Sequence, residues 1–304
     1  MNIKEMSRET LTGFAADLGG TKIAVARIQD GRVVDRRTVA TDPDASPEAH
    51  IAAIGKQLAD LGYSNNAPLG VAVAGRIDGS GAWHAVNRGT LSRIRDFPLS
   101  TALGSRLGDV SCLNDAAAAA FAEGLFGAGC RSESFAYLTV STGIGGGLVI
   151  GNRLLSSANG LAGHIGFVSS RFASGPCGSG RMATVESIAG GRGIAAAAAA
   201  SGHENTDARA VFAAAADGQG WAERIIATSA TAVAALIGDL TTILGLDTVA
   251  MGGSIGLAPG YIERVQAALN EEPAMFRPTL VHAELGHDGP LIGALAAHQR
   301  KETT

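Results

Sequence analysis

The stretch from residue 13 to residue 28, GFAADLGGTKIAVARI, carries the strongest fold signal in the chain. Two apolar runs flank a turn with two glycines, which predicts two antiparallel strands joined by a glycine-rich hairpin turn. Asp30-Gly31 predicts a second hairpin turn, followed by a third strand at 32–39. The chain therefore opens with antiparallel β-structure.

The same pattern returns in the middle of the chain. Residues 134–155, SFAYLTVSTGIGGGLVIGNRLL, again predict strand, glycine-rich turn, strand, Gly-Asn turn and strand. Two halves that each begin with such a hairpin predict a duplicated α/β architecture with a cleft between the halves. We place one domain at 1–122 plus 290–304 and the other at 123–289.

The remaining elements follow from helix signals and buried apolar runs. Ser46-Pro47 predicts a helix start, and Gly62 predicts its end. Alanine is the strongest helix former, so the alanine-rich runs predict helices. The other predicted strands are 68–75, 110–115 and 246–254, and the other predicted helices are 116–127, much of 185–245 and 289–302.

The composition excludes several classes of protein. The chain of 304 residues is 46% hydrophobic and 17% charged, which is typical of globular domains. A net charge of −4 without a basic run argues against nucleic-acid binding. No apolar run reaches the roughly 18 residues that span a bilayer, and the N-terminus shows no apolar signal core. Three scattered cysteines argue against a disulfide framework and indicate a reducing cytoplasm.

Three glycine-rich turns follow predicted strands, at 17–22, 141–147 and 252–254. Glycine lets backbone N–H groups approach a phosphate, and Thr21 and Lys22 add a hydroxyl and a positive charge. The first turn alone is equally an ordinary hairpin, but three such turns in this order favour a nucleotide site. None matches the GxxxxGK[ST] loop, and strand-like residues after the second turn exclude the Rossmann fingerprint.

Asn114-Asp115 closes a predicted strand directly before an alanine-rich helix. A carboxylate in this place can accept a proton from an attacking hydroxyl. The same pair is equally explained as a helix N-cap, and the two interpretations are compatible.

Six segments in order resemble the bacterial ROK (repressor, ORF, kinase) sugar kinases. Histidine in GLAGH and three further segments make the chain most similar to the N-acetylmannosamine kinases of that family. The six segments are DLGGTK (17–22), VAGRID (73–78), LNDAAAAAFAE (113–123), STGIGGGLVI (141–150), GLAGHIG (160–166) and VAMGGS (249–254). The three further ones are VESIAGGRGIAAAA (185–198), GGSIGLAPGY (252–261) and LGHDGPLIGAL (285–295).

The resemblance implies an actin/hexokinase-like (ribonuclease H-like) fold and the phosphorylation of N-acetylmannosamine at its 6-hydroxyl, a step of sialic acid catabolism. It implies ATP and Mg²⁺, a cytoplasmic homodimer, and Asp115 as the general base. A glucokinase, fructokinase or N-acetylglucosamine kinase is the alternative. A sugar-responsive repressor is less favoured, because only about 12 residues precede the first strand and no recognition helix is visible.

The resemblance also implies two sets of binding residues. Three of these residues have a structural alternative to a binding role. Arg76 is also explained as a surface residue, Asn87 as a turn former and His164 as a buried histidine. Asp17 would hold Mg²⁺ through water. The sugar set is Gly75, Arg76, Asn87, Asn114, Asp115, Gly143, His164 and Glu186. The ATP set is Asp17, Gly19, Gly20, Thr21, Lys22, Ser141, Thr142, Gly143, Gly145, Gly146, Gly252, Gly253 and Ser254.

The segment 160–186 departs from the family pattern, in which a histidine and three cysteines bind a structural zinc. Here Phe167, Ser179 and Thr184 stand at three of those positions, and Cys177 alone is kept. A tetrahedral zinc site needs four nitrogen or sulfur ligands, so we expect no structural zinc. A rearranged site that uses Cys177 and His164 is the alternative. The carboxylate at position 186 is retained in the sugar-binding register.

Overall fold

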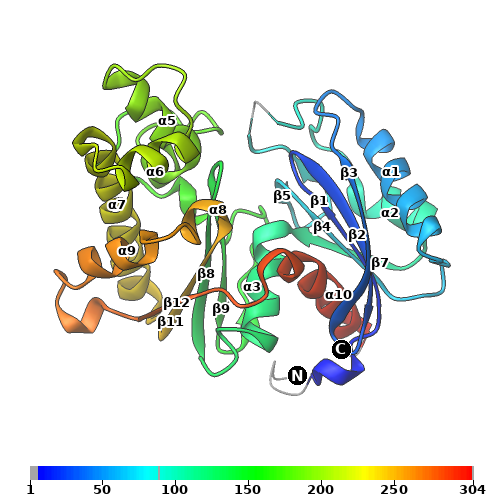
Figure 1. Ribbon diagram of the computed structural model, residues 1–304. Coiled ribbons are helices and arrows are strands. Elements are labelled where there is room, and N and C mark those ends of the chain that lie inside the picture. The colour runs from blue at the N-terminus through cyan, green and yellow to red at the C-terminus, as the bar shows by residue number, and fades with distance from the viewer. Residues whose placement is uncertain (1–5, 88–89, 303–304) are drawn as a thin grey trace. The chain divides into compact units, whose positions relative to one another are not determined.

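The computed structural model describes residues 6–87 and 90–302, which fold into two compact units (Figure 1). Unit 1 contains the described residues up to Arg131, then Gly147–Gly163 and the residues from Glu284 on. Unit 2 contains Ser132–Gly146 and His164–Ala283. The domain limits expected from the sequence stay a prediction. The units differ from them at 123–131, 147–163 and 284–289, which group with unit 1.

Unit 1 is built on a five-stranded sheet with the order β3-β2-β1-β4-β7. The first three strands run antiparallel, as the opening hairpins predict, whereas β4 and β7 continue the sheet parallel to β1. The strands are β1 (Gly13–Leu18), β2 (Lys22–Gln29), β3 (Arg32–Ala40), β4 (Leu69–Val73) and β7 (Val110–Asn114). A short antiparallel hairpin of β5 (Arg76–Ile77) and β6 (Trp83–His84) follows β4.

Helices cover both faces of this sheet (Figure 1). The larger core lies under α1 (Pro47–Asp60) and α2 (Leu99–Leu107), where the apolar positions of both helices meet those of the strands. The other face carries α3 (Asp115–Phe126) and α10 (Gly289–Glu302). A short η2 (Arg8–Thr10) precedes β1, and η5 (Gly286–Asp288) leads into α10.

Glycines let α10 approach the sheet and α3 closely. A methyl group on Gly70 of β4 would lie 2.1 Å from the backbone of Ala294, and one on Gly293 would lie 1.8 Å from the carbonyl oxygen of Ala118. Both contacts are with backbone atoms, which cannot move aside as the end of a side chain can. The last helix of the chain is thereby fixed against α3, whose first residue is Asp115.

The second sheet has the strand order β10-β9-β8-β11-β12. β8, β11 and β12 and the first residues of β9 belong to unit 2, and β8, β11 and β12 run parallel. The strands are β8 (Ser134–Val140), β9 (Ile144–Ile150), β10 (Arg153–Leu154), β11 (Thr248–Gly252) and β12 (Thr279–His282). The strand–turn–strand pattern predicted for 134–155 is confirmed.

Unit 2 holds the alanine-rich region, which is helical as predicted but broken into separate helices. The breaks follow local stop signals, such as Gly190 between the first two helices and the Ser201–Asp207 segment after the second. The helices are α4 (Val185–Ala189), α5 (Gly191–Ala200), α6 (Ala208–Ala216), α7 (Gly220–Leu244), α8 (Gly253–Gly256) and α9 (Tyr261–Leu269), with η3 (Ile165–Phe167) and η4 (Ala274–Phe276).

Helix α7 is long and apolar enough, by length and composition, to cross a membrane. However, 61% of its most apolar window is buried inside unit 2. Its buried face includes Ile226, Val233 and Ile237, which are at most 1% exposed. The helix therefore has the burial of a core helix.

Candidate active site

The carboxyl ends of β1, β4 and β7 meet at one edge of the sheet in unit 1. Leu18, Val73 and Asn114 are register partners across these parallel strands. In open α/β sheets this edge is where ligands bind. The register brings the predicted residues Asp17 and Asn114 to the same edge as the turn after β4, which carries Gly75.

Asn114 has the capping role and also orients its neighbour. Its side-chain oxygen accepts a hydrogen bond from the amide of Ala117 at 3.0 Å, and its amide nitrogen donates to the carbonyl oxygen of Gly75 at 2.9 Å. The same nitrogen donates to Oδ1 of Asp115 at 2.9 Å, and the amide of Ala116 donates to this oxygen at 2.8 Å. The carboxylate of Asp115 is thereby held in one orientation at the start of α3.

Burial changes the acidity of both carboxyl groups at this edge. Loss of hydration raises the pKa of Asp115 to about 6, against the hydrogen bonds from Ala116 and Asn114 that lower it. The pKa of Asp17 is raised to about 7, first by burial and then by the charge of Asp115, while Lys22 and Arg36 lower it. A carboxylate with a pKa near 6 is still ionised at neutral pH and is a stronger base than an exposed one.

These two acids also form a donor set that suits a hard cation. After burial, the charge of Asp115 is the next cause of the raised pKa of Asp17, so the two carboxyl groups lie close to each other at this edge. Carboxylate oxygens are the protein ligands that Mg²⁺ takes, commonly through its waters. Asp17 therefore fits the predicted role beside a magnesium–nucleotide complex.

The turn at 17–22 is a tight hairpin held by the residue that follows β3. The amide of Gly19 donates to the carbonyl of Lys22 at 2.9 Å, and the hydroxyl of Thr41 donates to the carbonyl of Gly19 at 2.8 Å. A methyl group on Gly20 would lie 2.8 Å from Thr90. The geometry satisfies the hairpin interpretation and leaves Thr21 and Lys22 exposed for a ligand.

In unit 2 the structure brings Glu186 and Gly143 together. Oε2 of Glu186 accepts a hydrogen bond from the amide of Ile144 at 3.1 Å, and Oε1 accepts one from Gly178 at 3.0 Å. A methyl group on Gly143 would lie 2.4 Å from Oε2. The second glycine turn and the end of the 164–186 loop are thus joined through one carboxylate.

The second and third glycine turns are neighbours, because β8 and β11 pair in parallel. The hydroxyls of Ser141 and Ser254 lie 3.0 Å apart. Gly253 has a φ of +86°, and a methyl group on it would lie 2.4 Å from the carbonyl oxygen of Val140. Backbone from both turns can therefore approach the same ligand.

A further segment, Gly190–Gly191, also contacts the second glycine turn, and it was not among the predicted site residues. The amide of Gly191 donates to the carbonyl of Ser141 at 2.7 Å, so the N-terminus of α5 lies against the second glycine turn. N–H groups at a helix start favour anions. The available signal was the Gly-Gly pair directly before an alanine-rich helix.

The residues at the positions where the family pattern has zinc ligands make other contacts. Thr184 is fully buried and caps α4, in a reciprocal capping box with Ser187. The ring of Phe167 stacks on His164 with centroids 5.9 Å apart, and Sγ of Cys177 lies 3.0 Å from Oγ of Ser179. These contacts account for how the loop is held, and the absence of zinc stays a prediction.

Two predicted sugar residues make backbone contacts in unit 1. Arg76 begins β5 and donates from Nη1 to the carbonyl oxygen of Asn159. Asn87 accepts a backbone hydrogen bond from Thr90 at 3.2 Å, as a turn former does, and its side chain is half-buried. Residues 88 and 89, between Asn87 and Thr90, lie outside the described part of the chain.

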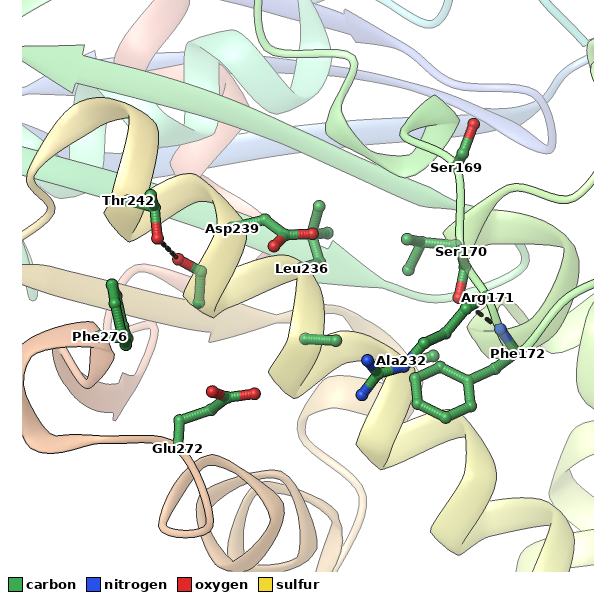
Figure 2. Close-up of a pocket in the computed structure, with 13 residues that line it drawn as sticks. Ser169, Ser170, Arg171, Phe172, Ala232, Leu236, Asp239, Thr242, Glu272 and Phe276 are labelled. Carbon is green, nitrogen blue, oxygen red and sulfur yellow. Dashed lines mark hydrogen bonds between the residues drawn. The ribbon is translucent and has the colours of Figure 1, made fainter.

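Each unit has a cavity lined by its own described residues. In unit 2 a cavity of about 270 Å³ is lined by the Ser169–Phe172 loop, α7 and the residues around η4, and it contains Arg171, Asp239 and Glu272 (Figure 2). In unit 1 a cavity of about 400 Å³ lies beside Asn114, with Leu154 and Leu155 on its wall.

The model of the ROK family matches residues 14–301 of the chain. The chain belongs to the ROK family.

Relatives agree with this assignment. A "Bifunctional enzyme NanE/NanK" of Brucella suis biovar 1 is 41% identical over 92% of the chain, and the chain spans only about half of that relative, 52% of its length. An "N-acetylmannosamine kinase" of Citrobacter koseri is 40% identical over 93% of this ROK protein and 97% of the relative. The ROK hexokinase structure from Thermus thermophilus is 30% identical, with a TM-score of 0.84 over 96% of this chain and 99% of that one. The predicted hexokinase-like fold is confirmed.

Proposed function

We propose that this ROK protein is an ATP-dependent sugar kinase that phosphorylates the 6-hydroxyl of N-acetylmannosamine to give N-acetylmannosamine 6-phosphate. The observation that carries the proposal is the Asn114–Asp115 pair, in which a partly buried carboxylate is fixed at the ligand-binding edge of the sheet. Curated relatives named N-acetylmannosamine kinase, about 40% identical over most of their length, support the choice of sugar.

Asp115 acts as the general base in this mechanism. A sugar hydroxyl is a weak nucleophile, so a carboxylate must take its proton as the bond to phosphorus forms. Asn114 and the amide of Ala116 hold Oδ1 of this carboxylate in place. With a pKa near 6, Asp115 is mostly ionised at pH 7 and binds the proton more strongly than an ordinary aspartate.

The glycine turns contribute backbone N–H groups to the phosphates. The turn at 17–22 serves unit 1, and the joined turns at 141–147 and 252–254 serve unit 2. Bound Mg²⁺ would neutralise charge on the phosphates. Asp17 would hold that ion through its waters, as its position beside Asp115 allows.

Sugar recognition in unit 2 is assigned to Glu186 and His164. Glu186 is fixed by two backbone amides and keeps lone pairs for sugar hydroxyls. An imidazole at 164 can donate or accept a hydrogen bond, which suits the acetamido group of a 2-acetamido sugar. Its ring is positioned by the stack on Phe167.

A hexose kinase is the second candidate. The likeness to the Thermus thermophilus hexokinase and to a Streptomyces griseus glucokinase structure at 26% identity favours it. We further propose a cytoplasmic homodimer without structural zinc.

The test is ATP consumption by the purified, metal-analysed protein with N-acetylmannosamine, N-acetylglucosamine, glucose and fructose. We expect a preference for N-acetylmannosamine of at least about ten-fold in kcat/KM, with phosphorus NMR placing the phosphate on O6. Preference for another sugar would replace the substrate and keep the kinase. Sugar binding without any turnover would support the sugar-responsive regulator instead.

A further inference from the structure

The hairpin β5–β6 is bonded to the backbone at Ala74, next to the Gly75 carbonyl that accepts a hydrogen bond from Asn114. Trp83 of β6 is fully buried, and its indole nitrogen donates to the carbonyl of Ala74 at 2.9 Å. Its own backbone exchanges hydrogen bonds of 2.7 and 3.1 Å with Phe97. The hairpin is therefore anchored on its inner side to the end of β4.

Gly75 lies between this hairpin and Asn114. It has a φ of +112°, and a methyl group on it would lie 2.6 Å from the carbonyl oxygen of His84 and 3.0 Å from the indole nitrogen of Trp83. The carbonyl oxygen of Gly75 accepts the hydrogen bond from Asn114. The bond from Trp83 to Ala74, the residue before Gly75, together with this close packing links the position of β6 to that of the Gly75 carbonyl oxygen.

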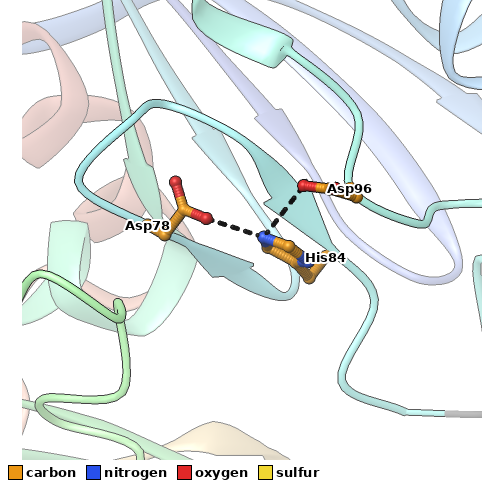
Figure 3. A group of neighbouring side chains, drawn as sticks. All are labelled: Asp78, His84 and Asp96. Carbon is orange, nitrogen blue, oxygen red and sulfur yellow. Dashed lines mark hydrogen bonds and ion pairs between the residues drawn. The ribbon is translucent and has the colours of Figure 1, made fainter.

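His84 is held by carboxylates on its other side (Figure 3). Its Nε2 lies 2.9 Å from Oδ2 of Asp78 and 3.9 Å from Oδ1 of Asp96. Oδ1 of Asp78 accepts from the hydroxyl of Ser80 at 2.6 Å and from the amide of Ala82 at 3.1 Å, so this carboxylate cannot rotate freely. Hydrogen bonds from Ser80 and then His84 lower the pKa of Asp78, which keeps it ionised.

We propose that His84 is a positioning residue for the phosphoryl transfer. The Asp78–His84 pair fixes β6, β6 fixes the Gly75 carbonyl, and that carbonyl fixes the Asn114 amide that orients Asp115. The inference rests on the proposed kinase function. It assigns a role to a histidine whose ion pairs are with Asp78 and Asp96 and that acts on Asp115 only through other residues.

The same three side chains carry atoms of the kinds that bind metals, and those atoms lie within 4.8 Å of one another. The direct Asp78–His84 hydrogen bond and the turn contacts of Asp78 explain their arrangement without an ion. A divalent cation at this place is the competing explanation, and the experiment includes it.

The experiment compares His84→Leu with His84→Gln, whose amide can replace Nε2 as a donor to Asp78. His282→Leu, at the exposed end of β12, is the matched control. For His84→Leu we expect a loss of about ten-fold or more in kcat, with the KM for ATP changed less than about two-fold. His84→Gln should recover most of the loss, and the control should match the wild type.

Hydrogen exchange gives a readout that does not depend on turnover. Amides of 74–78 and the first-turn amides Ala116 and Ala117 should exchange faster in His84→Leu and not in His84→Gln. A wild type that binds sugar but turns over none would contradict the proposed function, while the exchange data would still decide the inference. Unchanged exchange and kcat in a folded His84→Leu would overturn it. The inference would also be overturned if the protein bound one Zn²⁺ per chain, if this binding required His84, and if the added Zn²⁺ restored activity to the metal-free protein.

Discussion

Gly143 lies so close to Glu186 that a single methyl group on it would come within 2.4 Å of Oε2 of that glutamate. The atom in the way is the end of a flexible side chain, so it can move aside without a rearrangement of the backbone. Gly143 also has no left-handed φ that would strain an alanine. The contact therefore couples the second glycine turn to the proposed sugar-binding carboxylate.

We expect Gly143→Ala to raise the KM for the sugar about ten-fold or more, because the displaced Glu186 loses its hydrogen bonds to Ile144 and Gly178. The melting temperature should change by only a few degrees. Steady-state kinetics with varied sugar and a thermal melt check this. Gly104→Ala is the control, because Gly104 lies in α2 with open space around it. Gly151→Ala is unsuitable, because the φ of +55° at Gly151 would strain an alanine. An unchanged sugar KM would show that Glu186 does not touch the substrate.

Asp115→Asn should lower kcat by about two orders of magnitude or more, because asparagine cannot accept the proton. Asparagine keeps the oxygen that accepts from Ala116, so the helix start should stay intact. Calorimetry should show sugar affinity within a few-fold of the wild type. Near-normal turnover in this variant would remove Asp115 from the mechanism.

The kinase rate should fall as the pH drops through about 6, since protonated Asp115 cannot act as a base and burial raises its pKa to about 6. Activity is then present above this pH and lost below it. The measurement is kcat against pH between 4.5 and 8.5 at saturating substrates, where about 6 is the expected acid midpoint. A profile flat down to pH 5 would contradict the assignment.

The contribution of Asp17 to the free energy of unfolding should fall as the pH rises, whereas the kinase rate should rise. The folded-state pKa of Asp17, about 7, lies above its ordinary value of 3.8, so the folded state binds more protons than the unfolded state between these values. Asp17 therefore lowers the free energy of unfolding as the pH rises from about 4 to about 7. Asp17→Asn should raise the melting temperature at pH 7.5 by a few degrees while raising the KM for ATP. A lower melting temperature in this variant would refute the argument.

Glu123 ties the end of α3 to the segment before α10. It is 1% exposed, and its carboxylate accepts from the amides of Ala128 at 2.9 Å and Leu285 at 2.7 Å. Glu123→Ala leaves two amides unpaired and should cost roughly 2–4 kcal/mol in the free energy of unfolding. Urea unfolding at pH 7.5 measures this, with the exposed Glu271→Ala as control. Equal stability of the two variants would show that water replaces the lost carboxylate.

Removal of metal should leave the 164–186 loop intact. We expect dialysis against a strong chelator, followed by return to metal-free buffer, to change the melting temperature by less than about 2 °C. One zinc per chain together with a large loss of stability on chelation would disprove the zinc-free prediction.

Thr184→Ala should lower the free energy of unfolding by about 1–2 kcal/mol, because it removes the N-cap of α4.

Much of the secondary structure and the local geometry of the site was readable from the sequence. Asn114 caps the helix that follows it because a cap uses a side chain and an amide only three residues apart. The hairpin at 13–28 follows from apolar runs and a glycine turn that are adjacent in the chain. The strand predicted to reach residue 75 stops at Val73, since Gly75 adopts a φ of +112° to pass His84.

Contacts between distant segments were not readable from the sequence. Nothing in the residues around 190 shows that the start of α5 bonds to Ser141, or that Arg36 of β3 lowers the pKa of Asp17. His84 offered no signal of a link to Asn114. These relations depend on strand order and on close approaches such as that of Gly70 to Ala294, which join residues far apart in the chain.

Strands, turns and helix caps could be read from the sequence, because they depend on side-chain alternation and on hydrogen bonds over a few residues. Which turns lie side by side and which groups are buried together could be seen only in the folded chain, because both depend on the order of the strands in the sheets. Burial raises the pKa values of both Asp115 and Asp17, and the charge of Asp115 raises that of Asp17 further. Both effects depend on the packing of strands that are distant in the chain.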